Sequence, residues 1–307
     1  MGSNQGFGLT PPMTGQSGTA TRAHAKRRGV AALLVLPEGL WYLAFLIAPL
    51  IVLVVMSLGE RSPNGGYTAG FTLEQYGNLT TRITPLTNTL GLAFLNTIIC
   101  VLVAFPVAYT LALKVRGAWK LALVALVIVP FWTSFLIRTY AWMTLLGNQG
   151  IPSLLSGLGL GDIQLLNTPF AVSLGIVYNY LPLMVLPIYV SLDRLDHSFV
   201  EASRDLGAGP IATLRQIVLP LAAPGILSGI VLVFIPVMGE YLIPSLLGGG
   251  KTYFLGNALA DLFLQSRNWP FGAALAAVFV AGMVVIVAIY LAVSSRLVRA
   301  GREASLV

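Results

Sequence analysis

Residues 271–293 read FGAALAAVFVAGMVVIVAIYLAV, a run that contains no charged side chain. A transmembrane helix needs about 20 such residues to cross about 30 Å of hydrocarbon. The run also lacks the alternation of apolar and polar residues that a barrel strand would show. It therefore predicts a helix that crosses a membrane, and this prediction decides the fold class.

The composition of the whole chain agrees with a membrane location. Of its 307 residues, 56% are hydrophobic and only 9% are charged, whereas a soluble domain carries about 25% charged residues. Because so few charged residues cannot keep the protein surface in water, lipid must cover much of that surface. The net charge of +7 is more typical of basic cytoplasmic loops than of nucleic-acid binding in such a chain. We therefore expect membrane lipid, and no nucleic acid, as a partner.

Five further runs have the length of a membrane span, so we expect an all-α integral membrane protein with six transmembrane helices. The predicted spans are residues 33–58, 86–113, 121–145, 170–192, 221–247 and 271–293. Residues 1–30 are predicted to be a flexible cytoplasmic tail, because they are rich in Gly, Ser, Thr and Pro before a basic cluster. Residues 31–298 would form the transmembrane domain, and residues 299–307 a cytoplasmic C-terminal tail.

The distribution of basic residues predicts the orientation. With a cytoplasmic N-terminus, the loops on the inside hold 13 of the 18 Lys and Arg residues, those on the outside hold four, and Arg138 lies in a span. Cytoplasmic loops carry the excess of Lys and Arg in membrane proteins. The sequence therefore predicts both termini in the cytoplasm.

Proline and glycine mark the fourth and fifth spans. Prolines stand at positions 182, 187, 224, 236 and 244, and each removes a backbone donor. Helices of this kind line a bundle interior or a cavity, where the freed carbonyls find partners. Gly225 and Gly229 stand at G-x-x-x-G spacing, which permits close helix contact either within the chain or between subunits.

The polar loop between these spans, about residues 193–220, carries a spaced pattern. Its elements are Glu201, Ala202 and Ser203, then Gly207 after three residues, then Ile217, Leu219 and Pro220 after nine more. Small residues at 202 and 203 would let another protein surface approach a short helix closely. Gly207 suits the end of that helix, and Pro220 suits the first turn of the next one.

This pattern resembles the E-A-A loop of permease subunits of bacterial type I ATP-binding cassette (ABC) importers, in which E-A-A, three residues, G and nine residues precede I-x-L-P. Ser203 in place of alanine is the one departure. The resemblance implies the permease fold, with the loop as a cytoplasmic coupling helix that sits in a groove of an ATPase subunit. Glu201 would anchor this helix by polar contacts.

Three other stretches are similar to spermidine/putrescine importer permeases, namely residues 130–142, 239–249 and 268–274. The resemblance implies a bacterial inner-membrane protein that forms half of a polyamine pathway. Its partners would be a second homologous permease, two copies of a cytoplasmic ATPase and an extracytoplasmic polyamine-binding protein. ATP and magnesium would be bound by the ATPase, and this chain would hold no cofactor. Permeases of importers for iron, opines, phosphonates or amino-acid-like solutes share much of this sequence pattern, so they remain alternatives.

Glu240 is the main candidate for the translocation path, because a carboxylate inside a span costs about 2.5–3.5 kcal/mol. It lies 20 residues after Pro220, or about 30 Å along a continuous helix, which would place it near the outer mouth. A Glu240 in water or paired with Arg138 is the alternative. Arg138 itself, beside Tyr140 and Trp142, is expected to be a cation that snorkels to the membrane interface.

Aromatic faces attract ammonium ions, so several side chains near Glu240 or in the third and fourth spans are further candidates for the path. They are Tyr241, Trp132, Tyr178, Asn179 and Tyr180. Packing in the core or anchoring at the interface is the alternative for each of them.

Two other classes of protein fit less well. An ion-coupled secondary transporter would need ion-binding groups within the spans, which are almost empty of charge. A membrane enzyme or a metal site is disfavoured, because Cys100 is the only cysteine and His24 and His197 are far apart. Residues 248–252, GGGKT, resemble the end of a phosphate-binding loop but lack its first glycine. They are expected to form a turn, so ATP hydrolysis would belong to a partner.

Overall fold

The computed structural model describes residues 36–251 and 253–304, which fall into two compact units divided after Val55. The described part of the first unit lies in a helix from Leu36 to Ser57, which includes the π-helical turn η1 (Leu43–Ile47) and α2 (Ala48–Ser57). Its large apolar side chains are exposed, so an apolar medium such as lipid must cover them. The predicted tail, residues 1–30, lies outside the described residues.

The second unit is helical apart from one hairpin, in which β1 (Glu60–Arg61) pairs antiparallel with β2 (Tyr67–Thr68). The elements that follow are α3 (Glu74–Gly77), η2 (Asn78–Arg82), α4 (Ile83–Tyr109), η3 (Thr110–Lys114), α5 (Ala118–Ile128), η4 (Val129–Trp132), α6 (Phe135–Leu146), α7 (Ile151–Gly157), α8 (Pro169–Asp193), α9 (His197–Asp205), α10 (Pro210–Thr213), η5 (Leu214–Val218), α11 (Leu219–Met238), α12 (Leu242–Leu247), α13 (Leu255–Ala260), η6 (Asp261–Gln265) and α14 (Trp269–Ala304).

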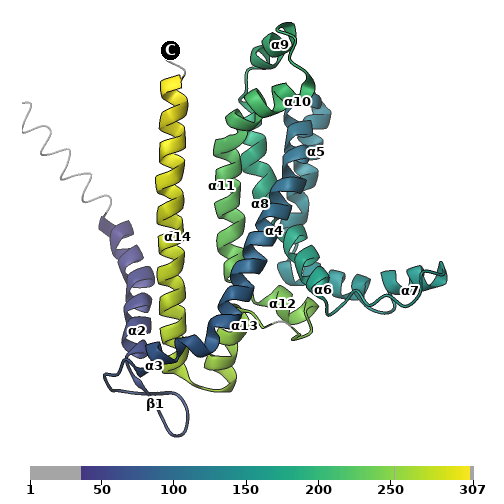
Figure 1. Ribbon diagram of the computed structural model, residues 1–307. Helices are drawn as coiled ribbons and strands as arrows, with labels where there is room; N and C mark the ends of the chain where they lie inside the picture. The colour runs from purple at the N-terminus through teal and green to yellow at the C-terminus, as the bar shows by residue number, and fades with distance from the viewer. Residues whose placement is uncertain (1–35, 252, 305–307) are drawn as a thin grey trace, which may run out of the picture. The chain divides into compact units, whose positions relative to one another are not determined.

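The core of this unit lies where α8 packs against α4 and α11 (Figure 1). The buried face of α4 is built from small side chains at helical spacing, including Ala93, Cys100, Ala104 and Ala108. Small residues let the helix backbones approach closely, which is how helices pack where lipid removes the hydrophobic driving force.

The glycine pair of the fifth span contributes to the same packing. A Cβ atom at Gly225 would clash with the carbonyl oxygen of Pro187 on α8, and one at Gly229 would lie 2.6 Å from the sulfur of Met184. The G-x-x-x-G spacing therefore serves contact between α11 and α8 within the chain.

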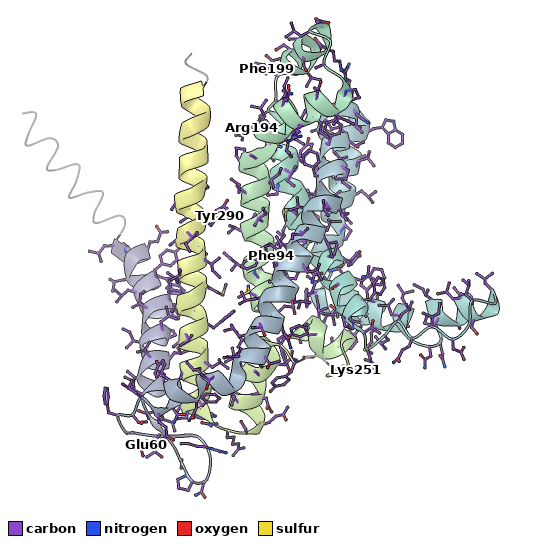
Figure 2. All side chains as sticks on the ribbon, in the orientation of Figure 1. Glu60, Phe94, Arg194, Phe199, Lys251 and Tyr290 are labelled. Carbon is purple, nitrogen blue, oxygen red and sulfur yellow. The ribbon has the colours of Figure 1, made fainter. Side chains whose placement is uncertain are left out.

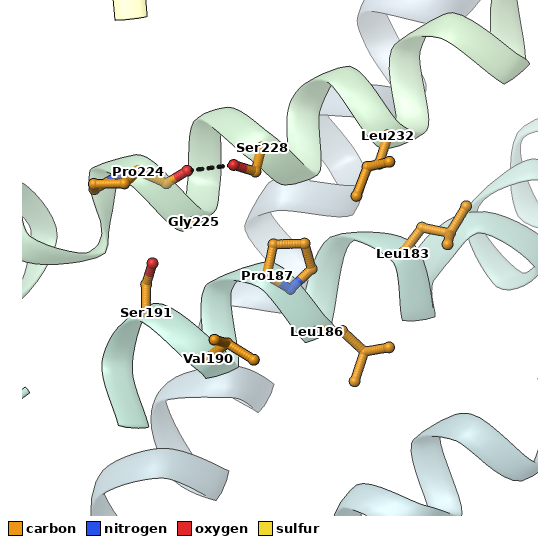
Figure 3. A pocket seen from close by; sticks show the side chains of 9 residues that line it. All are labelled: Leu183, Leu186, Pro187, Val190, Ser191, Pro224, Gly225, Ser228 and Leu232. Atoms are coloured by element: carbon orange, nitrogen blue, oxygen red, sulfur yellow. Dashed lines mark hydrogen bonds between the residues drawn. The ribbon is translucent and has the colours of Figure 1, made fainter. Parts of the chain in front are cut away.

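A shallow apolar groove runs beside this contact (Figure 3). It has a volume of about 370 Å³ and is lined from α8 and α11. Within it, Ser228 donates a hydrogen bond to the carbonyl oxygen of Pro224, at 2.8 Å. The lining does not include any side chain that the sequence predicts for the translocation path. The groove therefore follows from the small residues and prolines of the two helices.

The prediction of a continuous third span at 121–145 is wrong. The chain bends by 92° between the helical segments Ala118–Trp132 and Phe135–Gly157. Thr133 has extended backbone between these segments, and its hydroxyl donates to the carbonyl oxygen of Pro130 at 2.7 Å. Proline and a side chain that caps a free carbonyl end the first segment.

The prediction for the fifth span, 221–247, is wrong at its end. α11 begins at Leu219, continuous with α10 and η5 from Pro210, and it ends at Met238. α12 follows as a separate short helix. By contrast, the second, fourth and sixth spans are confirmed as helices Ile83–Lys114, Pro169–Asp193 and α14. Because α14 continues to Ala304, it takes up most of the predicted C-terminal tail.

The helices of the second unit place its loops at opposite ends. Arg194 and Phe199, which follow α8, lie at one end, and Lys251, which follows α12, lies at the other (Figure 2). The polar segment with α9 is thus separated by the length of α8 and α11 from the connections around α12 and α13 (Figure 1).

Candidate functional site

The spaced motif lies on α9 and the helix that follows it. The Asp196 side chain begins α9 by accepting a hydrogen bond from the backbone N–H of Ser198, at 2.9 Å. Gly207 follows the helix with a φ of +80°, and the N–H of Ala208 donates to the carbonyl oxygen of Ser203 at 3.0 Å. This is the Schellman arrangement, which favours glycine because of the left-handed backbone. Gly207 therefore ends α9 as the sequence predicts.

One side of α9 presents apolar side chains outward. Phe199 is 56% exposed and Leu206 is 88% exposed, and Ala202 and Glu201 are exposed beside them. Positions 199, 202 and 206 recur at helical spacing, so they share one face. An exposed apolar face next to a carboxylate has the composition of a docking surface.

Of the two small residues at which the sequence predicts close approach of another protein, Ala202 is exposed but Ser203 is not. Its side chain is buried, and its hydroxyl forms a hydrogen bond of 3.0 Å with the hydroxyl of Thr213 in α10. Thr213 also donates to the carbonyl oxygen of Gly209, at 3.2 Å. The departure from the consensus alanine thus ties α9 to α10. The sequence did not predict Thr213 as the hydrogen-bond partner of Ser203, since Thr213 is not part of the motif.

The end of the motif lies at the start of α11, whose first two residues are Leu219 and Pro220, as the sequence predicts for Pro220. The π-helical turn η5 precedes α11, and Pro210 occupies the first turn of the continuous helical stretch Pro210–Met238. Proline cannot donate to the carbonyl four residues earlier, and a π-helical turn immediately before it shifts the hydrogen-bond register. Ile217 is half-buried in this turn, and Leu219 and Pro220 are exposed.

Glu240 occupies the break between α11 and α12, where four hydrogen-bond donors reach it. Its side chain is 8% exposed. Oε1 accepts from the backbone N–H groups of Tyr241, Leu242 and Ile243 at 3.0–3.2 Å. Oε2 accepts from the hydroxyl of Tyr180 at 2.5 Å. The carboxylate thus caps the start of α12 and attaches it to α8.

Arg138 is also buried, with 9% of the residue exposed. The expectation of a snorkelling cation at the interface is therefore wrong. Its guanidinium lies 5.5 Å from the centre of the Phe131 ring. The bend before α6 turns this helix toward α8, which buries the side chain. Among the described residues, Arg138 and Glu240 form no ion pair.

The other candidates for the path are dispersed. Tyr178 packs its ring against Trp142, with centroids 5.4 Å apart. Asn179 is buried and donates to the carbonyl oxygen of Gly175 at 2.9 Å. Trp132 is largely exposed at the bend. The structure thus brings together Glu240, Tyr180 and the backbone of Tyr241, but not the remaining members of the predicted set.

The glycine-rich segment after α12 is a turn, as expected. Gly249 and Gly250 have φ values of +58° and +70°, and the N–H of Lys251 donates to the carbonyl oxygen of Gly248 at 3.3 Å. Within residues 36–251 and 253–304, no group of three His, Cys, Asp or Glu side chains could hold a metal ion.

Comparison with known proteins identifies relatives of this chain. Residues 24–299 match the family described as binding-protein-dependent transport system inner membrane component. The spermidine/putrescine transport system permease protein PotB of Haemophilus influenzae is 36% identical over 255 residues, which cover 81% of this chain and 89% of that protein. PotB of Escherichia coli K12 is 38% identical over 239 residues, covering 76% and 86%.

Solved structures show a similar fold. A chain of a bacterial alginate ABC transporter, in complex with a periplasmic protein that carries an alginate pentasaccharide, superimposes with a TM-score of 0.75 at 19% identity. The match covers 90% of this chain and 97% of that chain. A chain of the inward-facing MetNI methionine ABC transporter gives a TM-score of 0.53 at 19% identity, covering 75% and 99%. At such identities the likeness concerns the fold.

Proposed function

Because the chain belongs to the family of binding-protein-dependent transport system inner membrane components, we propose that it forms half of the membrane pathway of an ABC importer for polyamines, spermidine or putrescine. It is a multi-pass inner membrane protein with helices that can span the bilayer. The observation that carries the substrate assignment is the identity of 36–38% to PotB permeases over most of both chains.

The partners follow from the proposed function. A second homologous permease would complete the pathway, two copies of a cytoplasmic ATPase would bind ATP and magnesium, and an extracytoplasmic protein would deliver the polyamine. The exposed apolar face of α9, with Phe199, Ala202 and Leu206, is the surface that we propose for the ATPase. Glu201 lies exposed beside it, where it can make polar contacts.

The orientation that this function needs agrees with the charges at the two ends. Lys114 and Arg116 lie between α4 and α5, and Lys120 lies in the first turn of α5. Arg204 lies in α9, and Arg194 and Arg215 lie on either side of it. This end therefore carries the excess of basic residues that is typical of the cytoplasmic side. We propose that α9 and both termini are cytoplasmic.

A reconstituted complex tests the proposal. The chain is purified with its second permease and ATPase and placed in proteoliposomes with the binding protein. We expect uptake of labelled spermidine or putrescine that requires ATP and the binding protein. If the complex takes up a different solute and no polyamine, the assignment of polyamines as the substrate is refuted. Uptake by the chain alone along an ion gradient would refute the importer.

A variant of α9 tests the coupling role. Glu201→Ala should leave the chain folded, because this side chain is exposed, but it should lower polyamine uptake per ATP hydrolysed. Glu74→Ala changes an exposed carboxylate of α3 and serves as the control. An unchanged ratio of uptake to hydrolysis in Glu201→Ala would remove Glu201 from the coupling surface.

A further inference from the structure

Lys120, in the first turn of α5, contacts three other parts of the chain. Its Nζ forms an ion pair with Oδ1 of Asp193, the last residue of α8. It also donates a hydrogen bond to the carbonyl oxygen of Ala112 in η3, at 3.3 Å, and lies 5.8 Å from the centre of the Tyr189 ring. One ammonium group therefore joins the end of the second span, the start of the third and the end of the fourth.

The two oxygens that Lys120 contacts, Oδ1 of Asp193 and the carbonyl oxygen of Ala112, both lie at helix C-termini, where a positive charge is stabilising. Asp193 places a negative charge at the C-terminus of α8, where the helix dipole is already negative. The Ala112 carbonyl belongs to the last turn of its helix, in which carbonyl groups have no partner within the helix. The side chains of Lys120 and Asp193 are 28% and 38% exposed, so water and salt screen the pair less than a fully exposed one.

The ion pair is close in sequence to α9. Only two residues separate Asp193 from Asp196, whose side chain caps α9. Between them, Leu195 is buried in the main core. The connection between α8 and α9 is therefore short and held at both ends, so a displacement of α9 acts directly on Asp193.

We propose that Lys120 is a positioning residue that transmits the movement of α9 to the second and third spans. This inference rests on the proposed function, since it requires an ATPase that moves α9. Without Lys120, α9 would displace the end of α8 while α5 and the end of α4 no longer followed. ATP hydrolysis would continue, but less polyamine would be carried for each ATP.

The test is the ratio of spermidine uptake to ATP hydrolysis in proteoliposomes that hold the complete complex. Lys120→Met keeps all but the last atom of the length of the side chain and removes its charge, and we expect the ratio to fall by about threefold or more. Asp193→Asn should give a similar fall. Combining Lys120→Asp with Asp193→Lys should restore part of the ratio, because the effect belongs to the ion pair and not to either side chain alone.

Lys114→Met is the matched control. Lys114 lies in η3 at the same end of the unit, with its Nζ 5.6 Å from the centre of the Tyr109 ring. We expect the ratio of uptake to ATP hydrolysis in this variant to stay within about twofold of the wild-type ratio. Wild-type ratios in both Lys120→Met and Asp193→Asn would overturn the inference and leave the proposed function intact. A wild-type complex that carries no polyamine with ATP would refute the proposed function, and the inference with it.

Hydrogen exchange of the wild-type complex tests the inference without any variant, which matters if single variants do not assemble. Binding of a non-hydrolysable ATP analogue should change amide exchange in residues 197–206 and, together with it, in residues 117–124 at the start of α5. A change confined to residues 197–206 would overturn the inference.

Discussion

Glu240 receives hydrogen bonds from three backbone N–H groups and from the Tyr180 hydroxyl. An ionised carboxylate only accepts hydrogen bonds, and its oxygens offer about four such sites. Most of its capacity is therefore used within the chain in this conformation. Glu240 holds the break between α11 and α12 in place, whereas a direct contact with a polyamine would require some of these donors to leave.

Substitution of Glu240 separates these two roles. Glu240→Ala should lower the free energy of unfolding by about 1–3 kcal/mol, because the N–H groups and the Tyr180 hydroxyl lose a buried acceptor. Glu240→Gln keeps one acceptor oxygen, so it should lower the free energy of unfolding by a smaller amount. Thermal unfolding of the purified chain in detergent measures both, and Glu74→Gln, an exposed carboxylate, is the control.

The same Glu240→Gln variant also tests the translocation path. If Glu240 contacts the substrate, polyamine uptake should fall while the complex still assembles. Uptake with wild-type kinetics in an assembled complex would remove Glu240 from the path and leave only its role at the start of α12.

Ser203 is a second residue whose role depends on one contact. Ser203→Ala should cost about 0.5–1.5 kcal/mol of stability, because it removes the hydrogen bond to Thr213. The cost stays small, since Thr213 keeps its bond to Gly209. Ser203→Leu should be far more damaging, because the site is buried. Equal melting temperatures for the wild type and both variants would show that this contact does not stabilise the loop.

Among the elements, α9 depends on the backbone that ends it. Gly207→Ala should destabilise the segment by about 1 kcal/mol, since φ is +80° and an L side chain is strained there. A Cβ atom would meet no other atom within 4 Å, so the effect is conformational. Gly209→Ala is the control, because its φ of −69° suits alanine and its surroundings are equally open. Amide exchange in residues 197–206 should increase in the first variant alone.

The contact between α8 and α11 gives a second prediction for the elements. Gly225→Ala should destabilise the chain by about 1–3 kcal/mol, because the new methyl group would clash with the Pro187 carbonyl oxygen. Gly282→Ala in α14 meets no atom within 4 Å and should be neutral or slightly stabilising, since alanine favours a helix. Thermal unfolding compares them, and equal losses in both variants would contradict close packing at Gly225.

For the molecule as a whole, the orientation in the membrane can be measured. Leu206 is highly exposed on α9, and Leu158 is highly exposed in the connection that enters α8 from its other end. With the buried Cys100 unreactive, an impermeant thiol reagent should label Leu158→Cys in intact cells. It should label Leu206→Cys only in inside-out vesicles from which the ATPase has been removed. Labelling of Leu206→Cys from outside would exclude a cytoplasmic ATPase as the partner of α9.

Several features of the whole molecule could be predicted from the sequence. The second, fourth and sixth spans were found, because a long apolar run specifies a membrane helix without reference to the rest of the chain. The end of α9 at Gly207 was found, since a glycine after a short amphipathic segment is a local signal. The family resemblance was also carried by residues close together in the sequence.

The sequence alone therefore determined the class of the protein, most of its spans and the segment that resembles a coupling helix. The tertiary structure decided where helices break and which polar groups meet. The contacts of Glu240, Ser203 and Lys120 join residues that lie 8 to 73 positions apart in the sequence. Such contacts depend on how the helices pack against one another. Hydropathy is averaged along the chain, so it does not predict which distant residues meet.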